Sequence, residues 1–259
     1  MPPSVFTCAA AQIAVRRCES AADFAFNLTA HRRAMQHAAE ADVDVLVFPE
    51  LSLTGYELDR LAPLALAADD ARLDALAELA VRHGLTALVG APLAPTPPAG
   101  GKPHIGTVVL HPDGTRGRYA KQYLHASENE AATPGPAGAQ TFTRGDQVCA
   151  PAICYDTEHR AHAEAARHAG AGIYLAGVLW SEAGYAADAA TLAGHARELG
   201  LLAVLANHGA PSGGYRSAGR SAVWAPGGTL LACAPPAGEA LVVARQHREH
   251  WHGKVIPLA

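Results

Sequence analysis

Short apolar runs alternate with longer stretches of helical periodicity along most of the 259-residue chain. Residues 43–48 form a nearly continuous apolar run, which is typical of a strand buried on both faces. Residues 70–83 instead carry leucine and alanine at helical spacing, and Gly84 follows, as expected at a helix end. The same reasoning predicts strands at 5–13, 85–90, 107–110, 148–153, 173–179, 201–206, 221–225, 229–234 and 240–244, and helices at 21–39, 159–168 and 186–199.

Turn and capping residues mark the ends of several predicted elements. Ser20 or Asp23 is a suitable cap for the first helix. His-Pro-Asp-Gly at 111–114 is a turn signature that predicts a hairpin, and a Pro/Gly-rich loop is predicted around 95–101. The Pro-Gly-Gly turn at 226–228 lies among the last three strands, which are predicted to close the chain as a meander.

Composition and charge exclude several classes of protein. With 49% hydrophobic and 17% charged residues, the chain is not disordered. Since no composition break or solenoid repeat interrupts it, we predict one α/β domain over residues 1–259. A net charge of −4 without a basic block argues against nucleic acid as a partner. No apolar run reaches the ~18 residues that span a bilayer, so we predict no membrane partner.

Cysteine usage predicts a reduced, cytoplasmic protein. The five cysteines are scattered and lack a C-x-x-C pair, which argues against a disulfide framework and against a Cys-rich zinc site. The first residues also lack the basic start and apolar stretch of a secretory signal. Cys8, Cys149 and Cys233 fall inside predicted strands and are interpreted as buried structural residues.

Three reactive side chains lie just past predicted strands, where ligands bind in open α/β sheets. Glu50 follows a buried run, so its carboxylate must be paired or protonated; it is either functional or a cap on a backbone amide. Lys121 lies between apolar neighbours, either as a catalytic cation or as a surface residue. Cys154 lies where a strand turns into a helix. The helix dipole there can lower the pKa of a thiol, and backbone N–H groups can stabilise an oxyanion, which indicates a nucleophile.

The sequence around these residues resembles the motifs of the nitrilase superfamily, the carbon–nitrogen hydrolases. Phe-Pro-Glu at 48–50, Tyr-Ala-Lys-Gln-Tyr-Leu-His at 119–125 and Ile-Cys-Tyr-Asp at 153–156 are similar, in order and spacing, to the family's Glu, Lys and Cys motifs. Residues 219–232 are similar to its late G-x-S-x-x-x-x-P-x-G-x-x-L hairpin, and 196–207 to its "A-R-x … N" segment. Three separated motifs in order are a much stronger signal than any one of them.

The resemblance implies an α-β-β-α sandwich that cleaves the C–N bond of a small linear amide and releases ammonia, without a cofactor. It implies that Glu50 is the general base and that Lys121 stabilises the tetrahedral intermediate. Cys154 would attack the amide carbonyl and form a covalent thioester. The backbone N–H of Tyr155 would face the charge that develops on the oxygen.

Several positions differ among members of the family and leave choices open. Many members carry a second Glu between the Lys and the Cys, and here Glu128 is preferred over Glu130. Cys154 is followed by Tyr-Asp rather than the Trp-Glu of true nitrilases, which favours an amidase over a nitrilase. Trp180 follows the next strand and is either a wall of the substrate pocket or a core residue.

Other functions and partners are also considered. An N-carbamoyl amino acid amidohydrolase, a nitrilase and a non-catalytic binding protein on the same fold are the alternatives. His159 and His162 share a helix face, and His247, His250 and His252 cluster near the C-terminus, but neither group has a zinc-binding spacing. We therefore predict no metal site. The resemblance further implies a homodimer or higher homo-oligomer, formed through the face that carries the helix after the cysteine motif.

Overall fold

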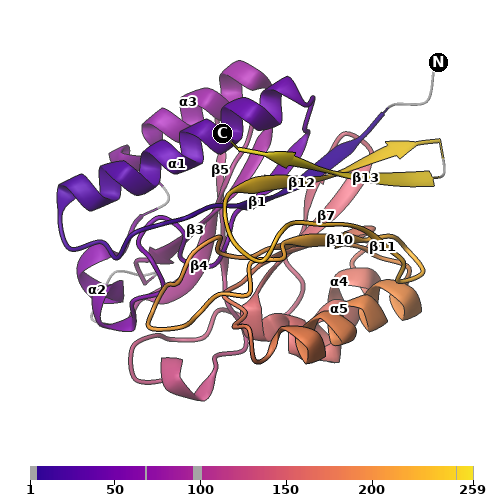
Figure 1. Cartoon of the computed structure of the whole chain (residues 1–259). Helices are drawn as coiled ribbons and strands as arrows, with labels where there is room; N and C mark the ends of the chain where they lie inside the picture. The colour runs from indigo at the N-terminus through magenta and orange to yellow at the C-terminus, as the bar shows by residue number, and fades with distance from the viewer. Residues whose placement is uncertain (1–4, 68, 96–100, 249, 259) are drawn as a thin grey trace.

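The computed structural model describes residues 5–67, 69–95, 101–248 and 250–258. Its strands form two sheets that pack face to face, with helices on both outer faces (Figure 1). This arrangement is the α-β-β-α sandwich that the family resemblance implies. Part of the predicted Pro/Gly-rich loop, residues 96–100, lies outside the described residues.

One sheet has seven strands and the other has six, and each has three parallel strands at its centre. The seven-stranded sheet has the order β13-β12-β1-β2-β3-β4-β5 and the six-stranded sheet has the order β11-β10-β9-β8-β7-β6. The first consists of β1 (Thr7–Gln12), β2 (Val45–Val47), β3 (Thr86–Leu93), β4 (His104–Leu110), β5 (Arg116–Ala120), β12 (Ala240–His247) and β13 (His250–Pro257). The second consists of β6 (Phe142–Arg144), β7 (Gln147–Ile153), β8 (Ile173–Gly177), β9 (Leu202–Ala206), β10 (Ala222–Trp224) and β11 (Leu230–Cys233).

Four longer helices and several short turns connect these strands. Ser20 caps the first helix and Asp23 completes its capping box, so both candidate capping residues take part. The helices are α1 (Ala21–Glu40), α2 (Leu61–Leu64), α3 (Asp74–His83), α4 (Arg160–His168) and α5 (Tyr185–Leu199), and the 3₁₀ turns are η1 (Leu58–Arg60), η2 (Ala71–Leu73), η3 (Ala126–Glu128) and η4 (Cys154–Glu158). Within the described residues, none of these helices is both long and apolar enough to cross a membrane.

The cores follow from the alternation of side chains along the central strands. In β1, Cys8 and Ala10 point between the two sheets, where they join a cluster that includes Leu175 of β8. Ala9 and Ala11 point the other way, into the core beneath α1 and α3. Since successive side chains of a strand alternate between faces, each apolar central strand contributes to two cores at once.

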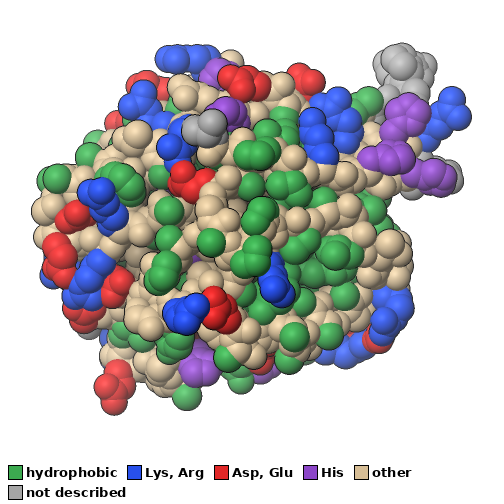
Figure 2. All heavy atoms as spheres, in the orientation of Figure 1, with side chains coloured by type: hydrophobic (Ala, Val, Ile, Leu, Met, Phe, Trp, Pro, Cys, Tyr) green, Lys and Arg blue, Asp and Glu red, His purple; other side chains and the backbone are tan. Residues whose placement is uncertain are grey.

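The closing meander is the part of the fold prediction that is wrong. Strands β10 and β11 pair as predicted, but β12 then crosses to the other sheet, where it pairs with β1 and β13. Strand β13 was not predicted because its exposed and half-buried residues lack a continuous apolar run. The β12–β13 hairpin projects from the body, and Figure 2 shows histidine side chains gathered at that place. His247, His250 and His252 of this hairpin lie around one shallow hollow.

Candidate active site

Glu50 lies in a tight turn directly after β2, and two glycines make room for that turn. A Cβ atom on Gly90 would lie 2.1 Å from the Pro49 carbonyl oxygen, and one on Gly177 would lie 2.4 Å from the carbonyl oxygen of Phe48. Any larger residue at either position would displace the turn. The Glu50 side chain is buried, with 1% of its surface exposed. The carboxylate is therefore held rigidly at the end of the central strand.

Lys121 follows β5 directly and reaches the same place from the neighbouring loop. Its backbone N–H donates to the carbonyl oxygen of Ile105 at 2.9 Å, and Gly135 N–H donates to the Lys121 carbonyl at 2.7 Å. Its Nζ lies 2.8 Å from Glu50 Oε1 and 2.7 Å from Glu128 Oε1. All three side chains are buried. We call Glu50, Lys121 and Glu128 the charged triad.

Glu128 is the more fully hydrogen-bonded of the two carboxylates. Besides the lysine, its Oε1 accepts from the Tyr56 hydroxyl at 2.6 Å, and its Oε2 accepts from the backbone N–H of His125 at 2.8 Å. Three donors on one carboxylate stabilise its ionised form. Glu130, the other candidate, is exposed. The structure thus brings Glu128, and not Glu130, to Lys121.

Cys154 is the first residue of η4, immediately after β7. Its φ of 43° lies in the left-handed region, which is unusual for a residue with a side chain and typical of strained functional positions. The thiol is partly buried, and its Sγ lies 3.9 Å from the carbonyl oxygen of Leu179. The expected strand end is present, and a five-residue 3₁₀ turn separates it from the helix predicted at 159–168, which begins at Arg160.

The electrostatics of the thiol differ from the sequence prediction of a lowered pKa. Burial raises the pKa of Cys154 well above its ordinary value, and the Glu50 carboxylate raises it further, while the Lys121 ammonium lowers it. A helix dipole from so short a turn does not compensate for the loss of solvent. The thiol is therefore protonated at rest and needs a base to become a nucleophile.

Glu50 has the properties that such a base requires. The pKa of Glu50 is raised to about 7. Burial raises it most, the Lys121 ammonium lowers it and the Glu128 carboxylate raises it again. Within the described part of the chain, Glu50 Oε2 has no hydrogen-bond partner. Burial alone would lower the pKa of Lys121, but Glu50, Cys154 and Glu128 raise it, so the ammonium keeps its proton.

Asp156 ties the cysteine turn to the lysine loop, a role that the sequence did not reveal. Its Oδ2 accepts from Ile153 N–H at 2.9 Å and from the Tyr119 hydroxyl at 2.6 Å. Its Oδ1 accepts from the backbone N–H groups of Gln122 and Tyr123 at 3.0 and 2.9 Å. One buried carboxylate thus fixes the relative positions of the segments that carry Lys121 and Cys154.

His159 and His162, at the start of α4, both contact tyrosine side chains. His162 hydrogen-bonds the hydroxyl groups of Tyr119 and Tyr174, each at 2.7 Å, and burial lowers the pKa of its imidazole. The ring of His159 stacks on Tyr123 with a centroid distance of 3.8 Å. Among the residues that the structure describes, no three His, Cys, Asp or Glu side chains are grouped to hold a metal ion.

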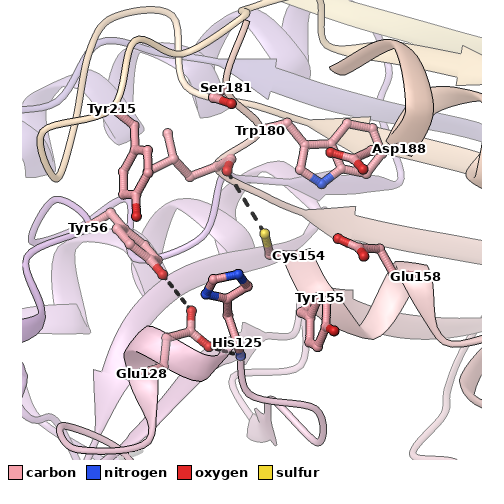
Figure 3. Close-up of a pocket in the computed structure, with 11 residues that line it drawn as sticks. Tyr56, His125, Glu128, Cys154, Tyr155, Glu158, Trp180, Ser181, Asp188 and Tyr215 are labelled. Carbon is pink, nitrogen blue, oxygen red and sulfur yellow. Dashed lines mark hydrogen bonds between the residues drawn. The ribbon is translucent and has the colours of Figure 1, made fainter. Parts of the chain in front are cut away.

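A pocket of about 150 Å³ opens over Cys154 (Figure 3). Tyr155 and Trp180, both predicted to contact substrate, line it. Trp180 also packs in the core, with 2% of its surface exposed. Leu179, which follows the same predicted strand as Trp180, and His125, the last residue of the lysine motif, also line the pocket. The lining residues that carry no motif signal are Tyr56, Glu158, Ser181, Asp188 and Tyr215.

Comparison with known proteins identifies the family. The carbon–nitrogen hydrolase family model matches residues 9–252 of this chain. No curated protein matches it significantly. Among solved structures, the chain is similar to the amidase from Nesterenkonia sp. AN1, a member of the nitrilase superfamily.

Three structures of that amidase illustrate the similarity, each at 24% sequence identity. A double mutant in complex with acrylamide gives a TM-score of 0.83 and covers 96% of this chain and 93% of that chain. A mutant in complex with butyramide gives 0.81, with 94% and 92% covered. A third, in which the acetamide moiety of fluoroacetamide has added covalently to the active-site cysteine, gives 0.81, with 93% and 90% covered.

The family match covers nearly the whole chain and contains all three motifs that the sequence analysis identified. The matched structures have the same two-sheet fold over more than nine-tenths of their length. The chain belongs to the carbon–nitrogen hydrolase family.

Proposed function

We propose that this protein hydrolyses a small linear amide through a thioester on Cys154 and releases ammonia. The observation that carries the proposal is the position of Lys121 Nζ, which contacts the carboxylates of Glu50 and Glu128 at 2.8 and 2.7 Å, while Glu128 also lines the pocket that contains Cys154. A base, a fixed cation and a nucleophile are the groups that acyl transfer from an amide requires.

In the first half of the reaction, the thiol proton of Cys154 passes to Glu50 as the sulfur attacks the amide carbonyl carbon. The negative charge on the carbonyl oxygen is met by the Lys121 ammonium and by the backbone N–H of Tyr155, since the first N–H groups of a helical turn have no acceptor within the turn. Glu50 then gives its proton to the leaving nitrogen. The C–N bond breaks, ammonia departs and a thioester remains.

In the second half, Glu50 removes a proton from water as the water attacks the thioester. The C–S bond breaks, the carboxylic acid is released and the thiol regains its proton. Glu128 takes no proton in this scheme, because its oxygen atoms already accept three hydrogen bonds. Its role is to hold the lysine ammonium in position beside Glu50.

The size of the pocket supports a small substrate. Pockets for drug-sized ligands enclose roughly 300–1,000 Å³, whereas this one encloses about 150 Å³. The related amidase binds butyramide and acrylamide, which are small neutral amides. An N-carbamoyl group or a nitrile remains an alternative. Carbamoyl hydrolysis yields carbon dioxide with the ammonia, so product analysis identifies it, whereas an amide and a nitrile both yield an acid and ammonia and are distinguished by which of the two is consumed.

The test is ammonia release from a panel of aliphatic amides, ω-amides, N-carbamoyl amino acids and nitriles. For any substrate found, Cys154→Ala should release no ammonia. Cys233→Ala is the matched control, because Cys233 is also a partly buried free thiol but lies outside this pocket. Undiminished turnover by Cys154→Ala would refute the proposed mechanism.

We further propose a cytoplasmic homodimer formed through the face that carries α4 and α5, as the family resemblance implies. A shallow groove beside α5 supports this face, since it is lined by Ala189, Ala193 and Leu230, and Leu230 is 52% exposed. Sedimentation equilibrium of the wild type and of Leu230→Glu tests it. A wild type that sediments as a monomer would refute the dimer.

A further inference from the structure

The side of the pocket opposite the charged triad is acidic. Glu158, the last residue of η4, and Asp188 of α5 both line the pocket. Figure 3 shows them on the far side of Cys154 from Glu128 and Tyr56. We call Glu158 and Asp188 the acidic wall. Within the described residues, neither side chain forms an ion pair or a hydrogen bond with another side chain, and no Lys or Arg lines the pocket.

Glu158 is close enough to Asp188 to disfavour the charge of the Asp188 carboxylate. Burial raises the pKa of Asp188 above its ordinary value, and the negative charge of Glu158 raises it further. Two like charges beside an apolar cavity, without a cation from the protein, are stabilised when a ligand brings a positive charge between them.

The buried indole N–H of Trp180, in the same part of the pocket, is a second feature that favours a bound ligand. The indole Nε1 of Trp180 is buried and has no acceptor within the described chain. In Figure 3 this nitrogen faces the space between Cys154 and Glu158. A buried N–H without an acceptor costs free energy, which a bound molecule with an acceptor atom recovers. The aromatic rings of Trp180 and Tyr155 add surfaces that attract cations.

We propose that the pocket selects small amides that carry a positively charged amino group. The acidic wall binds the ammonium group while the amide lies against Cys154, and the Trp180 N–H donates to an acceptor atom of the substrate. The proposal rests on the proposed amide hydrolysis and adds the charge of the substrate to it.

Three amides of similar length and different charge test the proposal. These are 4-aminobutanamide, which is cationic, pentanamide, which is neutral, and succinamate, which is anionic. We expect kcat/KM of the wild type to be about 10-fold higher for the cationic amide than for the neutral one, because a hydrogen bond to a charged group is the stronger kind. The anionic amide should be the poorest substrate. Equal or higher kcat/KM for pentanamide would overturn the proposal.

Variants of the acidic wall locate the effect. Glu158→Gln and Asp188→Asn should each lower the ratio of kcat/KM for 4-aminobutanamide to that for pentanamide by several-fold, and the double variant should bring the ratio close to one. Glu198→Gln is the matched control, because Glu198 is an exposed carboxylate on the same helix as Asp188 and pairs with Arg160. A ratio that is unchanged in the double variant would overturn the proposal.

Binding measurements separate this inference from the proposed reaction. If none of the three amides is hydrolysed, the proposed function fails, and calorimetry with Cys154→Ala still tests the acidic wall. Tighter binding of 4-aminobutanamide than of pentanamide, weakened by added salt, would support the wall as a cation site. Equal affinities would overturn it.

Discussion

The charged triad and the acidic wall, on opposite sides of the pocket, differ in how their carboxylates are paired. In the charged triad, a buried lysine contacts both carboxylates, and Glu128 receives two further hydrogen bonds. In the acidic wall, Glu158 is exposed, Asp188 is half-buried, and no cation of the described chain accompanies them. Both carboxylates of the triad contact a cation of the protein, whereas the wall lacks a cation that a ligand can supply.

This difference follows from solvation. A charge removed from water must be paired within the protein, so the triad cannot change one member without leaving another unpaired. Carboxylates that keep contact with water can remain unpaired at little cost in folding free energy. The acidic wall can therefore be used to bind a substrate. Reaction chemistry and substrate choice are thereby placed on opposite sides of the same cysteine.

The largest effect is expected from Lys121→Met. The substitution leaves the carboxylates of Glu50 and Glu128 buried together without a cation, which should lower the free energy of unfolding by about 3–5 kcal/mol. It also removes a donor to the oxyanion, which should lower kcat by about 10²–10³-fold. Urea unfolding followed by circular dichroism measures the first and ammonia release the second.

Lys102→Met is the matched control for this prediction. The ammonium of Lys102 is exposed and donates to the backbone oxygen of Asn129 at 2.9 Å. Its loss should change the free energy of unfolding by less than about 0.5 kcal/mol. If both lysine variants unfold at the same urea concentration, the triad does not depend on its lysine in the way proposed.

Sequence reasoning reached the triad because its members lie in contiguous motifs. Glu50 follows an apolar strand that the hydrophobic pattern identifies, Lys121 lies in the family's lysine motif, and the family resemblance places a second glutamate between that lysine and the cysteine motif. The acidic wall carries no such signal. Glu158 and Asp188 are ordinary polar positions of helical segments, and only the packing of η4 against α5 brings them to one pocket.

The elements of the fold could likewise be predicted where the signal is local, and their tertiary arrangement could not. Local alternation and caps predicted β1 through β4 and all of α1, but not the sheet that a strand joins. Strand β12 has the apolar pattern of any central strand, and its pairing with β1, more than 200 residues away, is a tertiary choice. The prediction of a lowered pKa for the Cys154 thiol is wrong for a similar reason, because burial by distant segments raises this pKa more than a local helix turn can lower it.

The pH dependence of the reaction tests the role of the base. Glu50 must be ionised to take the thiol proton, and burial raises its pKa to about 7. Below that pH the carboxyl is protonated, so kcat/KM should fall about 10-fold for each pH unit. The raised pKa of Lys121 means that this ammonium causes no loss on the alkaline side.

Glu50→Gln is the control for the pH profile. Its rate should be about 10³-fold lower, since general base catalysis contributes on that order, and its profile should lack the acidic limb. A wild-type profile that stays flat from about pH 8 to about pH 5 would contradict a base whose pKa is raised by burial.

The smallest effect is expected from Tyr56→Phe, which removes one of the three donors to Glu128. Lys121 and the His125 backbone N–H still hold the carboxylate, so we expect a loss of about 1–2 kcal/mol in the free energy of unfolding and less than about 10-fold in kcat. Tyr215→Phe is the comparison, because Tyr215 packs edge-to-face on Tyr56 at 6.0 Å but its 45% exposed side chain makes no hydrogen bond in the described structure. Its free energy of unfolding should change by less than about 0.5 kcal/mol. Equal losses in the two variants would mean that the aromatic contact, rather than the hydroxyl group on Glu128, is what Tyr56 contributes to the triad.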